Sequence, residues 1–256
     1  MRMQVIVCLA AAVAAFVAGG AAVRAAKPED NRLTRERGRQ VFERSCLWCH
    51  GAGGRGDGPA AFYLGRYSSP RPRDFVQDNF KFRSTASGEL PTDQDLYRTV
   101  TQGIPGYMPS FASLTEEQRW QVIAYVKSFN PAFQEEKPVP LPMGPPPYPS
   151  SEESIQRGRE VYGRYGCLVC HGTEGRGAGP ESEAHLQDSR GLRIRAADLT
   201  DRASFKGGAM PLDIYRSLVT GLDGTPMPSY ADQIAGKENE AWDLVYYILS
   251  LSAEAK

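Results

Sequence analysis

The chain has 256 residues, of which 30 are Lys or Arg and 30 are Asp or Glu, so its formal net charge is zero. Hydrophobic residues make up 41% and charged residues 23%, close to the averages of soluble globular proteins. This composition excludes collagen, a wholly disordered chain and a polytopic membrane protein, and the balanced charge argues against a dedicated nucleic-acid binder. The length allows one large domain or two small ones.

The N-terminal segment has the pattern of an export signal. The long apolar run covers residues 5–23, with Arg2 before it and small residues after it. This pattern predicts a secretory signal peptide at residues 1–26, and therefore a periplasmic, exported protein. The alternative is an uncleaved N-terminal anchor, because 19 residues are close to the roughly 20 that span a bilayer. Cleavage would remove Arg2 and Arg24 and leave 28 basic against 30 acidic residues.

The rest of the chain contains a duplication with an offset of about 120 residues. The matching segments are RGRQVFER at 37–44 and RGREVYGR at 157–164, CLWCHG at 46–51 and CLVCHG at 167–172, and MPSF at 108–111 and MPSY at 227–230. A repeat of this length is a duplicated domain and not a short solenoid unit. We therefore expect domain 1 at residues 27–133 and domain 2 at residues 151–256.

A proline-rich linker separates the copies at residues 134–150. Proline favours extended polyproline geometry, so this segment is expected to act as a semi-rigid spacer. A ligand for a proline-recognising domain is the alternative interpretation. The sequence leaves open whether the two domains dock on each other or swing on the spacer.

The apolar periodicity predicts an all-α fold with long loops. Each copy is expected to open with a short helix and to close with a stronger one, at residues 34–45, 120–129, 154–166 and 242–251. Thr115 and Gln118 have the spacing of a capping box before the first closing helix. Apolar residues cover more than one side of both closing helices, which indicates burial on several sides.

The motif Cys-x-x-Cys-His occurs twice, as Cys46, Cys49 and His50 and as Cys167, Cys170 and His171. Two thiols at this spacing can each add to one vinyl group of a haem, and the adjacent imidazole can then bind the iron. The motif is the attachment signature of c-type haem. With five Cys and three His in the chain, two such motifs at the repeat offset are not a chance event. The sequence therefore predicts two covalently bound haem c groups, each with an iron.

The cysteine pairs allow three other interpretations. A thioredoxin-like redox pair expects a βαβ context, which the sequence lacks. A structural zinc site would need both pairs on one metal, and structural disulfides would suit an oxidising compartment. The zinc and disulfide interpretations do not explain the histidine that follows each second cysteine, nor the repeated methionines.

Methionine is the best candidate for the sixth iron ligand. Met108 and Met227 follow their cysteine pairs by about 60 residues, and each precedes Pro-Ser-aromatic. A thioether is a soft, neutral ligand that raises the reduction potential. Met210 is a rival for the second iron, but Leu90 stands at the matching position of the first copy. His185 has no counterpart in the first copy and is interpreted as a surface residue or a hydrogen-bonding neighbour. The expected metal ligands are thus His50, Met108, His171 and Met227.

On these motifs each copy resembles a class I cytochrome c domain, and the resemblance covers residues 34–252. In that family the opening helix crosses the closing helix at a Gly followed by an aromatic residue four positions later. The matching residues are Gly38 with Phe42 and Gly158 with Tyr162, with Tyr125 and Tyr247 as their partners. The resemblance also makes Arg83 a candidate cation beside the haem propionates, and the second copy lacks this Arg.

The resemblance implies an electron carrier and no enzyme, because six-coordinate iron has no vacant position. The expected partners are a membrane dehydrogenase, an oxidase or reductase, or another cytochrome of a respiratory chain. Two alternatives stay open. One is a two-haem redox enzyme of peroxidase or thiol-oxidising type, which needs an iron with a different sixth position. The other is a cytochrome c subunit of a membrane oxidase or dehydrogenase complex.

Overall fold

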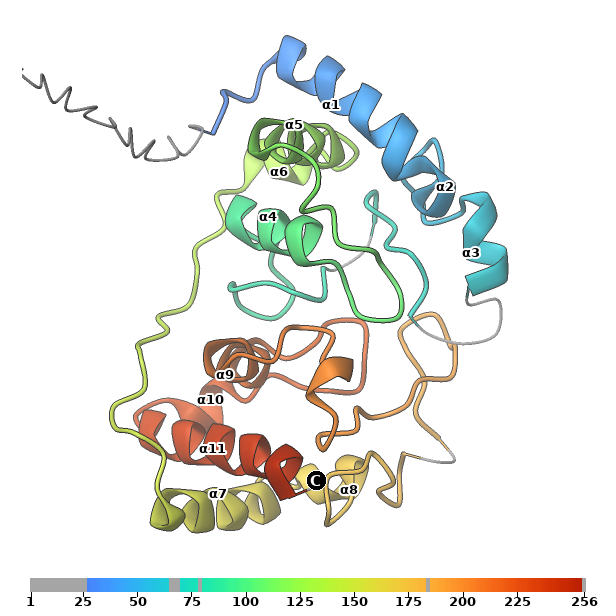
Figure 1. The fold of residues 1–256 in the computed structure, drawn as a ribbon. Coiled ribbons are helices and arrows are strands. Elements are labelled where there is room, and N and C mark those ends of the chain that lie inside the picture. Colours follow the sequence, from blue (N-terminus) through green and yellow to red (C-terminus); the bar gives the residue numbers. More distant parts are fainter. Residues whose placement is uncertain (1–26, 65–69, 78–79, 183–184, 255–256) are drawn as a thin grey trace, which may run out of the picture.

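The computed structural model describes residues 27–64, 70–77, 80–182 and 185–254, so the predicted export signal lies outside the described residues. This part of the chain is helical and contains two isolated β-bridges but no β-strand, which confirms the predicted all-α class (Figure 1). None of its helices combines the length and hydrophobicity that crossing a membrane requires. The helices are α1 (Arg32–Ser45), α2 (Leu47–His50), α3 (Pro59–Leu64), α4 (Asp93–Gln102), α5 (Glu116–Lys127), α6 (Ala132–Glu135), α7 (Glu152–Arg164), α8 (Cys167–His171), η1 (Arg202–Ser204), α9 (Pro211–Thr220), α10 (Ala231–Ile234) and α11 (Glu238–Glu254).

The four predicted helices are all present as α1, α5, α7 and α11, and each begins two to four residues earlier than expected. Their first residues are mainly polar, so the apolar periodicity could not mark where they start. At α1, α5 and α7 side-chain caps mark it instead, since they satisfy backbone N–H groups that have no partner inside a helix. The predicted capping box is confirmed: Gln118 N donates to Thr115 Oγ1 at 3.1 Å, and Thr115 N donates to Gln118 Oε1 at 3.0 Å.

Each opening helix crosses its closing helix at a glycine, α1 on α5 and α7 on α11. A Cβ atom on Gly38 would lie 1.9 Å from the carbonyl oxygen of Gln121. One on Gly158 would lie 2.0 Å from that of Asp243. Beside each crossing two aromatic rings meet edge to face with 5.3 Å between centroids, Phe42 with Tyr125 and Tyr162 with Tyr247. The expected crossing is therefore confirmed in both copies.

The two cores repeat the same packing. In domain 1, Trp120 of α5 stacks on Tyr97 of α4 with 4.2 Å between ring centroids. In domain 2, Trp242 of α11 stacks on Tyr215 of α9 at 4.7 Å. All four side chains are buried. Stacked aromatic pairs of this kind stabilise a core beyond the burial of their area, by about 0.5–1.5 kcal/mol each.

A buried arginine of domain 1 joins the two domains. Arg83 has no exposed surface, and its Nη2 donates to Asp223 Oδ1 at 2.8 Å and to Thr220 O at 2.7 Å, both in domain 2. Its Nε donates to Ala86 O and its Nη1 to Phe80 O, at 2.9 and 3.2 Å. Each guanidinium nitrogen thus donates to a protein oxygen. The expectation that Arg83 pairs with haem propionates is therefore wrong, and the residue holds the domains together instead.

Residues at matching positions of the repeat meet at the same interface. Burial lowers the pKa of Arg98, and the positive charge of Arg216, its repeat counterpart, lowers it further. Burial also lowers the pKa of Lys81, and the positive charge of its counterpart Lys206 acts in the same direction. Equivalent residues lie near each other where two copies face each other with the same surface. The domains therefore pack with equivalent faces toward each other.

The proline-rich spacer is bound to both domains. The backbone N of Leu141 donates to Ser84 O of domain 1 at 2.8 Å. The hydroxyl of Tyr148 donates to Asp243 Oδ1 of domain 2 at 2.8 Å. Leu141, Met143 and Tyr148 also pack, partly buried, against the core of domain 2. The sequence left open whether the domains dock or swing. In the structure the domains dock on each other, and the spacer is bound to both of them.

Replacing Gly158 with Ala is expected to destabilise the protein by about 1–3 kcal/mol, because the added methyl group would overlap the backbone of α11. Thermal unfolding followed by circular dichroism measures the loss. Gly163→Ala is the matched control, since it lies on the same helix with open space at its Cβ position. It is expected to be neutral or stabilising by up to about 1 kcal/mol. Equal stability of the two variants would contradict the close crossing.

Replacing Arg83 with Gln is expected to cost about 3–5 kcal/mol, because it leaves the carboxylate of Asp223, only 8% exposed, without its charge partner. Denaturant unfolding measures this loss. Arg39→Gln on α1 is the control, since its ion pairs with Glu36 and Glu43 are on the surface and are expected to contribute little. If both variants unfold at the same denaturant concentration, docking does not depend on Arg83.

Candidate functional site

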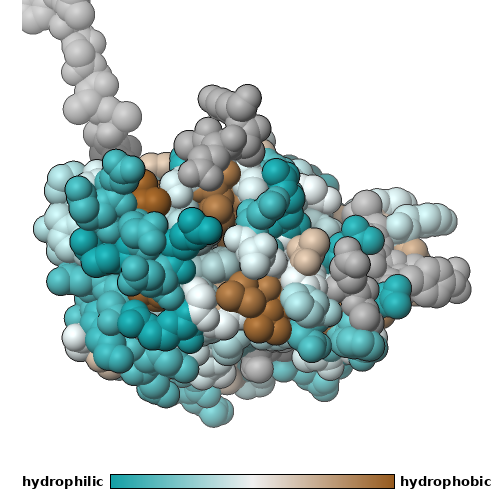
Figure 2. Space-filling view, turned by 90° about the horizontal axis from the view of Figure 1, so that it is seen from below, coloured by the Kyte–Doolittle hydropathy of each residue, from teal (hydrophilic) through white to brown (hydrophobic). Residues whose placement is uncertain are grey.

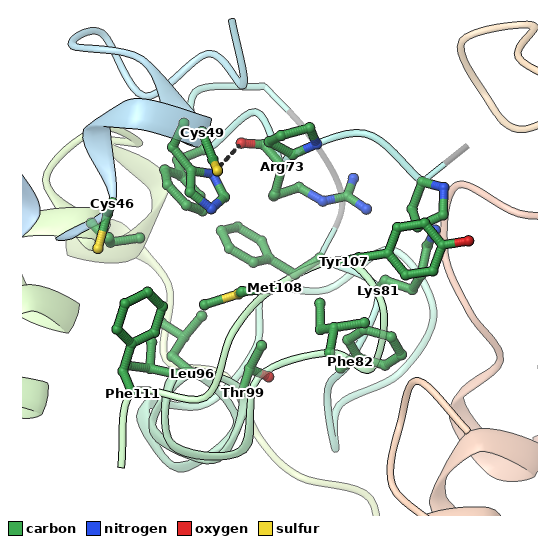
Figure 3. A pocket seen from close by; sticks show the side chains of 18 of the residues that line it. Cys46, Cys49, Arg73, Lys81, Phe82, Leu96, Thr99, Tyr107, Met108 and Phe111 are labelled. Atoms are coloured by element: carbon green, nitrogen blue, oxygen red, sulfur yellow. Dashed lines mark hydrogen bonds between the residues drawn. The ribbon is translucent and has the colours of Figure 1, made fainter. Parts of the chain in front are cut away.

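Domain 1 contains a pocket between α2, α4, α5 and the loop that carries Met108 (Figure 3). It holds about 1300 Å³ of empty space, part of it open to solvent. Its walls are mainly apolar, and Cys46, Cys49, His50 and Met108 all line it. The structure thus brings the four predicted site residues of domain 1 to one cavity.

One helical turn orders each Cys-x-x-Cys-His motif. Cys46 is the C-cap of α1, and the backbone N of His50 donates to Cys46 O at 2.9 Å across α2. In domain 2 the whole motif forms α8, which follows α7 after Tyr165 and Gly166. Because the motif continues the opening helix, the crossing at the glycine also sets where its thiols and imidazole lie.

The two motif histidines are held in the same way. His50 Nδ1 donates to Arg73 O at 3.1 Å, the dashed line in Figure 3, and His171 Nδ1 donates to Ala197 O at 3.0 Å. A carbonyl only accepts, so Nδ1 holds the proton and Nε2 keeps its lone pair for a metal. Burial lowers the pKa of both imidazoles, which favours this neutral form. His185 is exposed, as expected of a surface residue.

Glycines after each motif wrap the chain back onto the histidine. Gly56 N donates to His50 O, and Gly177 N donates to His171 O, both at 2.9 Å. Their φ angles of 69° and 73° lie in the left-handed region that side chains disfavour. A Cβ atom on Gly56 would also lie 2.3 Å from Pro72 O. The close return of the loop explains why glycine stands there.

The cysteines lack the features of a dithiol redox centre. No disulfide joins the four described cysteines. Burial raises the pKa of Cys46 to about 12 and that of Cys167 to about 11, whereas a dithiol redox centre needs a thiolate. Figure 1 places α2 and α8 far apart, and in the described ranges no three His, Cys, Asp or Glu residues gather around a metal position. The thioredoxin and zinc readings therefore have no support in the geometry.

The methionine loops also correspond. Ile104 N donates to Met108 O at 2.8 Å, and Leu222 N donates to Met227 O at 3.1 Å. Figure 3 shows the Met108 side chain pointing into the pocket, and Met227 packs against the core of domain 2. Met210, in contrast, is 68% exposed at the N-cap of α9. This arrangement favours Met227 over Met210 as the sixth ligand in domain 2.

Sequence reasoning missed a group of cations on the pocket wall. They are Arg71, Arg73, Lys81 and Lys206, here called the basic cluster, and Lys206 comes from domain 2. The Nε atom of Arg71 is buried without a hydrogen-bond partner. No local motif marks these residues, because they come from separate segments. Their only signal was that Lys81 and Lys206 follow a phenylalanine at matching positions of the repeat.

The pocket fits a covalently bound haem c on all of these counts. The thiols can hold the vinyl edge, the imidazole can hold the iron, and the apolar walls can enclose the ring. The basic cluster suits the carboxylates of the propionate groups. When bound, haem c supplies an iron that accepts and releases one electron.

The comparisons with known proteins agree with this site. The model of the family described as cytochrome C oxidase, cbb3-type, subunit III matches residues 34–126, and that of cytochrome c matches residues 155–252. Among solved structures, a chain of the Kuenenia stuttgartiensis reducing HAO-like protein complex Kustc0457/Kustc0458 is 42% identical, with a TM-score of 0.76. The match covers 84% of this chain and 96% of that chain. No curated protein matches.

The protein therefore belongs to the c-type cytochromes, which carry electrons. It consists of two cytochrome c domains in tandem, and these bind two haem c groups covalently.

Replacing Met227 with Ala is expected to remove the charge-transfer absorption of one Met-ligated ferric iron, to lower one reduction potential and to let oxidised iron bind cyanide. Absorption spectra with and without cyanide measure this. Met210→Ala is the matched control in the same domain and is expected to behave as the unchanged protein, because its side chain is exposed. The opposite result, with Met210→Ala losing the absorption, would assign the ligand to Met210.

Proposed function

We propose that the protein is an exported dihaem carrier that passes single electrons between periplasmic or membrane-bound respiratory redox proteins. The observation that supports this most directly is the placement of a methionine near the attachment motif of domain 1 and the matching methionine loop of domain 2. Met108 shares a pocket with His50, and the loop of Met227 repeats the backbone pairing of Met108. Irons with these two ligands have no vacant position for O₂, peroxide or another substrate. Export rests on the signal pattern of residues 1–26.

We propose further that one partner is a HAO-like redox protein. The solved chain that is 42% identical belongs to a reducing HAO-like protein complex. The likeness covers nearly the whole of that chain, so any surface through which it contacts its partner has a counterpart within this protein. The net charge near zero offers no strong field for long-range steering, so docking is expected to depend on local contacts.

An exposed aromatic surface beside the first attachment site suits such docking. Trp48 of α2 is 63% exposed, and Phe62 and Tyr63 of α3 are 55% and 87% exposed. Helices α2 and α3 contact each other, and we call these three residues the α2–α3 patch. Trp48 lies between the two cysteines of its motif, so a partner seated there would approach the haem edge closely. Exposed aromatic residues of this kind are enriched where proteins bind each other.

Domain 2 presents a different surface. Its corresponding motif residue is Val169, a smaller side chain that is 40% exposed. The face seen from below in Figure 2 is mainly hydrophilic, with separate small hydrophobic areas. We therefore assign the HAO-like partner to the α2–α3 patch of domain 1.

Replacing Trp48 with Ser is expected to weaken binding to a purified HAO-like partner by about tenfold or more, the effect of losing a central aromatic contact. Isothermal titration calorimetry measures the affinity. Leu33→Ser on α1 is the control, since it removes an apolar side chain of the same domain that is 59% exposed and outside the patch. Equal affinities of the two variants would refute the patch. Absence of any HAO-like protein after purification from native cells would refute the partner and leave the electron carrier standing.

A further inference from the structure

Domain 2 forms part of the pocket wall in domain 1. Lys206, which follows η1, lines that pocket, and its Nζ lies 4.6 Å from the ring centroid of Tyr107, the residue before Met108. The next residue, Gly207, packs on Phe82, because a Cβ atom there would lie 3.5 Å from the Phe82 ring. The haem site of domain 1 is therefore completed only when the domains are docked.

Two members of the basic cluster, Lys81 and Lys206, share a pocket wall on which the described residues place no carboxylate. Among the described residues that line the pocket, none is Asp or Glu. Neither Lys81 nor Lys206 forms an ion pair with a carboxylate in the described part of the chain. Burial, and then the like charges of Arg73 and Lys206, lower the pKa of Lys81 to about 8 despite the opposing effect of Asp188, and burial lowers that of Lys206. Cations brought together in this way call for an anionic ligand.

The position of the basic cluster matches one edge of a haem. Figure 3 shows Cys46 and Lys81 at opposite ends of the pocket, with segments of domain 2 beside the Lys81 end. In a haem the vinyl groups and the propionate groups lie at opposite edges of the ring. A haem attached through Cys46 and Cys49 would therefore present its two carboxylates to the basic cluster.

We propose that Lys206 of domain 2 is a counter-ion for the propionate carboxylates of the haem in domain 1. The proposal rests on the two haem c groups that the family carries and is independent of the HAO-like partner. A positive charge at this edge favours the reduced iron, which has one positive charge fewer than the oxidised iron. Docking of domain 2 thereby raises the reduction potential of domain 1.

The test is a spectroscopic redox titration of the full dihaem protein carrying Lys206→Gln. The reduction equilibrium constant of the domain 1 haem is expected to fall on the order of tenfold, which is about 59 mV for one electron, while the domain 2 haem is unchanged. The transition of domain 1 is identified as the one that Met108→Ala moves, because Met108 lines that pocket.

Three further variants separate charge from structure. Lys206→Arg keeps the charge, so the domain 1 haem is expected to have the same potential as in the unchanged protein. A purely structural role of the lysine stem would not predict this result. Lys206→Met removes the charge but keeps an apolar stem over Tyr107. It is expected to shift the potential as Lys206→Gln does, and it provides the test if Lys206→Gln folds poorly. Lys237→Gln removes an exposed charge of domain 2 and is expected to change neither potential. An unchanged domain 1 potential in Lys206→Met, or a shift confined to domain 2, would overturn the proposal.

Discussion

The crossing of two helices at a single glycine is the contact on which the rest of each domain depends. Because α2 continues directly from α1, the approach of Gly38 to the backbone of α5 also fixes where the attachment motif lies. From α5, Ile123 and Val126 then line the same pocket as Cys46 and His50. A domain of about 100 residues has only a modest apolar core. One close backbone contact per domain therefore orders both the core and the haem site.

Much of this architecture could be predicted from local patterns. Apolar periodicity located the four main helices, and the motifs identified the cofactor, because both signals lie within short stretches of sequence. The docking of the domains could not be predicted in this way. Arg83 and Asp223 are 140 positions apart, and neither lies in a segment whose spacing points to the other. The basic cluster is likewise assembled from separate segments of both domains, so its charge becomes visible only when they are in place.

Duplication left the two halves similar in packing but different at their interface. Where domain 1 has Arg83, the matching segment of domain 2 has Gly208, at a φ of 103°. A Cβ atom there would lie 2.3 Å from a carboxylate oxygen of Asp213. The halves have thus acquired unequal roles: one supplies a buried cation, and the other supplies the carboxylate that receives it. Because of this difference the two similar domains form an asymmetric pair with a defined relative orientation.

The docked spacer has a kinetic consequence. A flexible tether lets two attached domains sample many separations, and it sets only their effective concentration. Here the chain between the domains is bonded at Ser84 on one side and Asp243 on the other. Electron transfer between two haems held in these docked domains is expected to occur across one separation, at a rate that does not depend on protein concentration. No diffusional encounter between the two domains is then needed before an electron moves from one to the other.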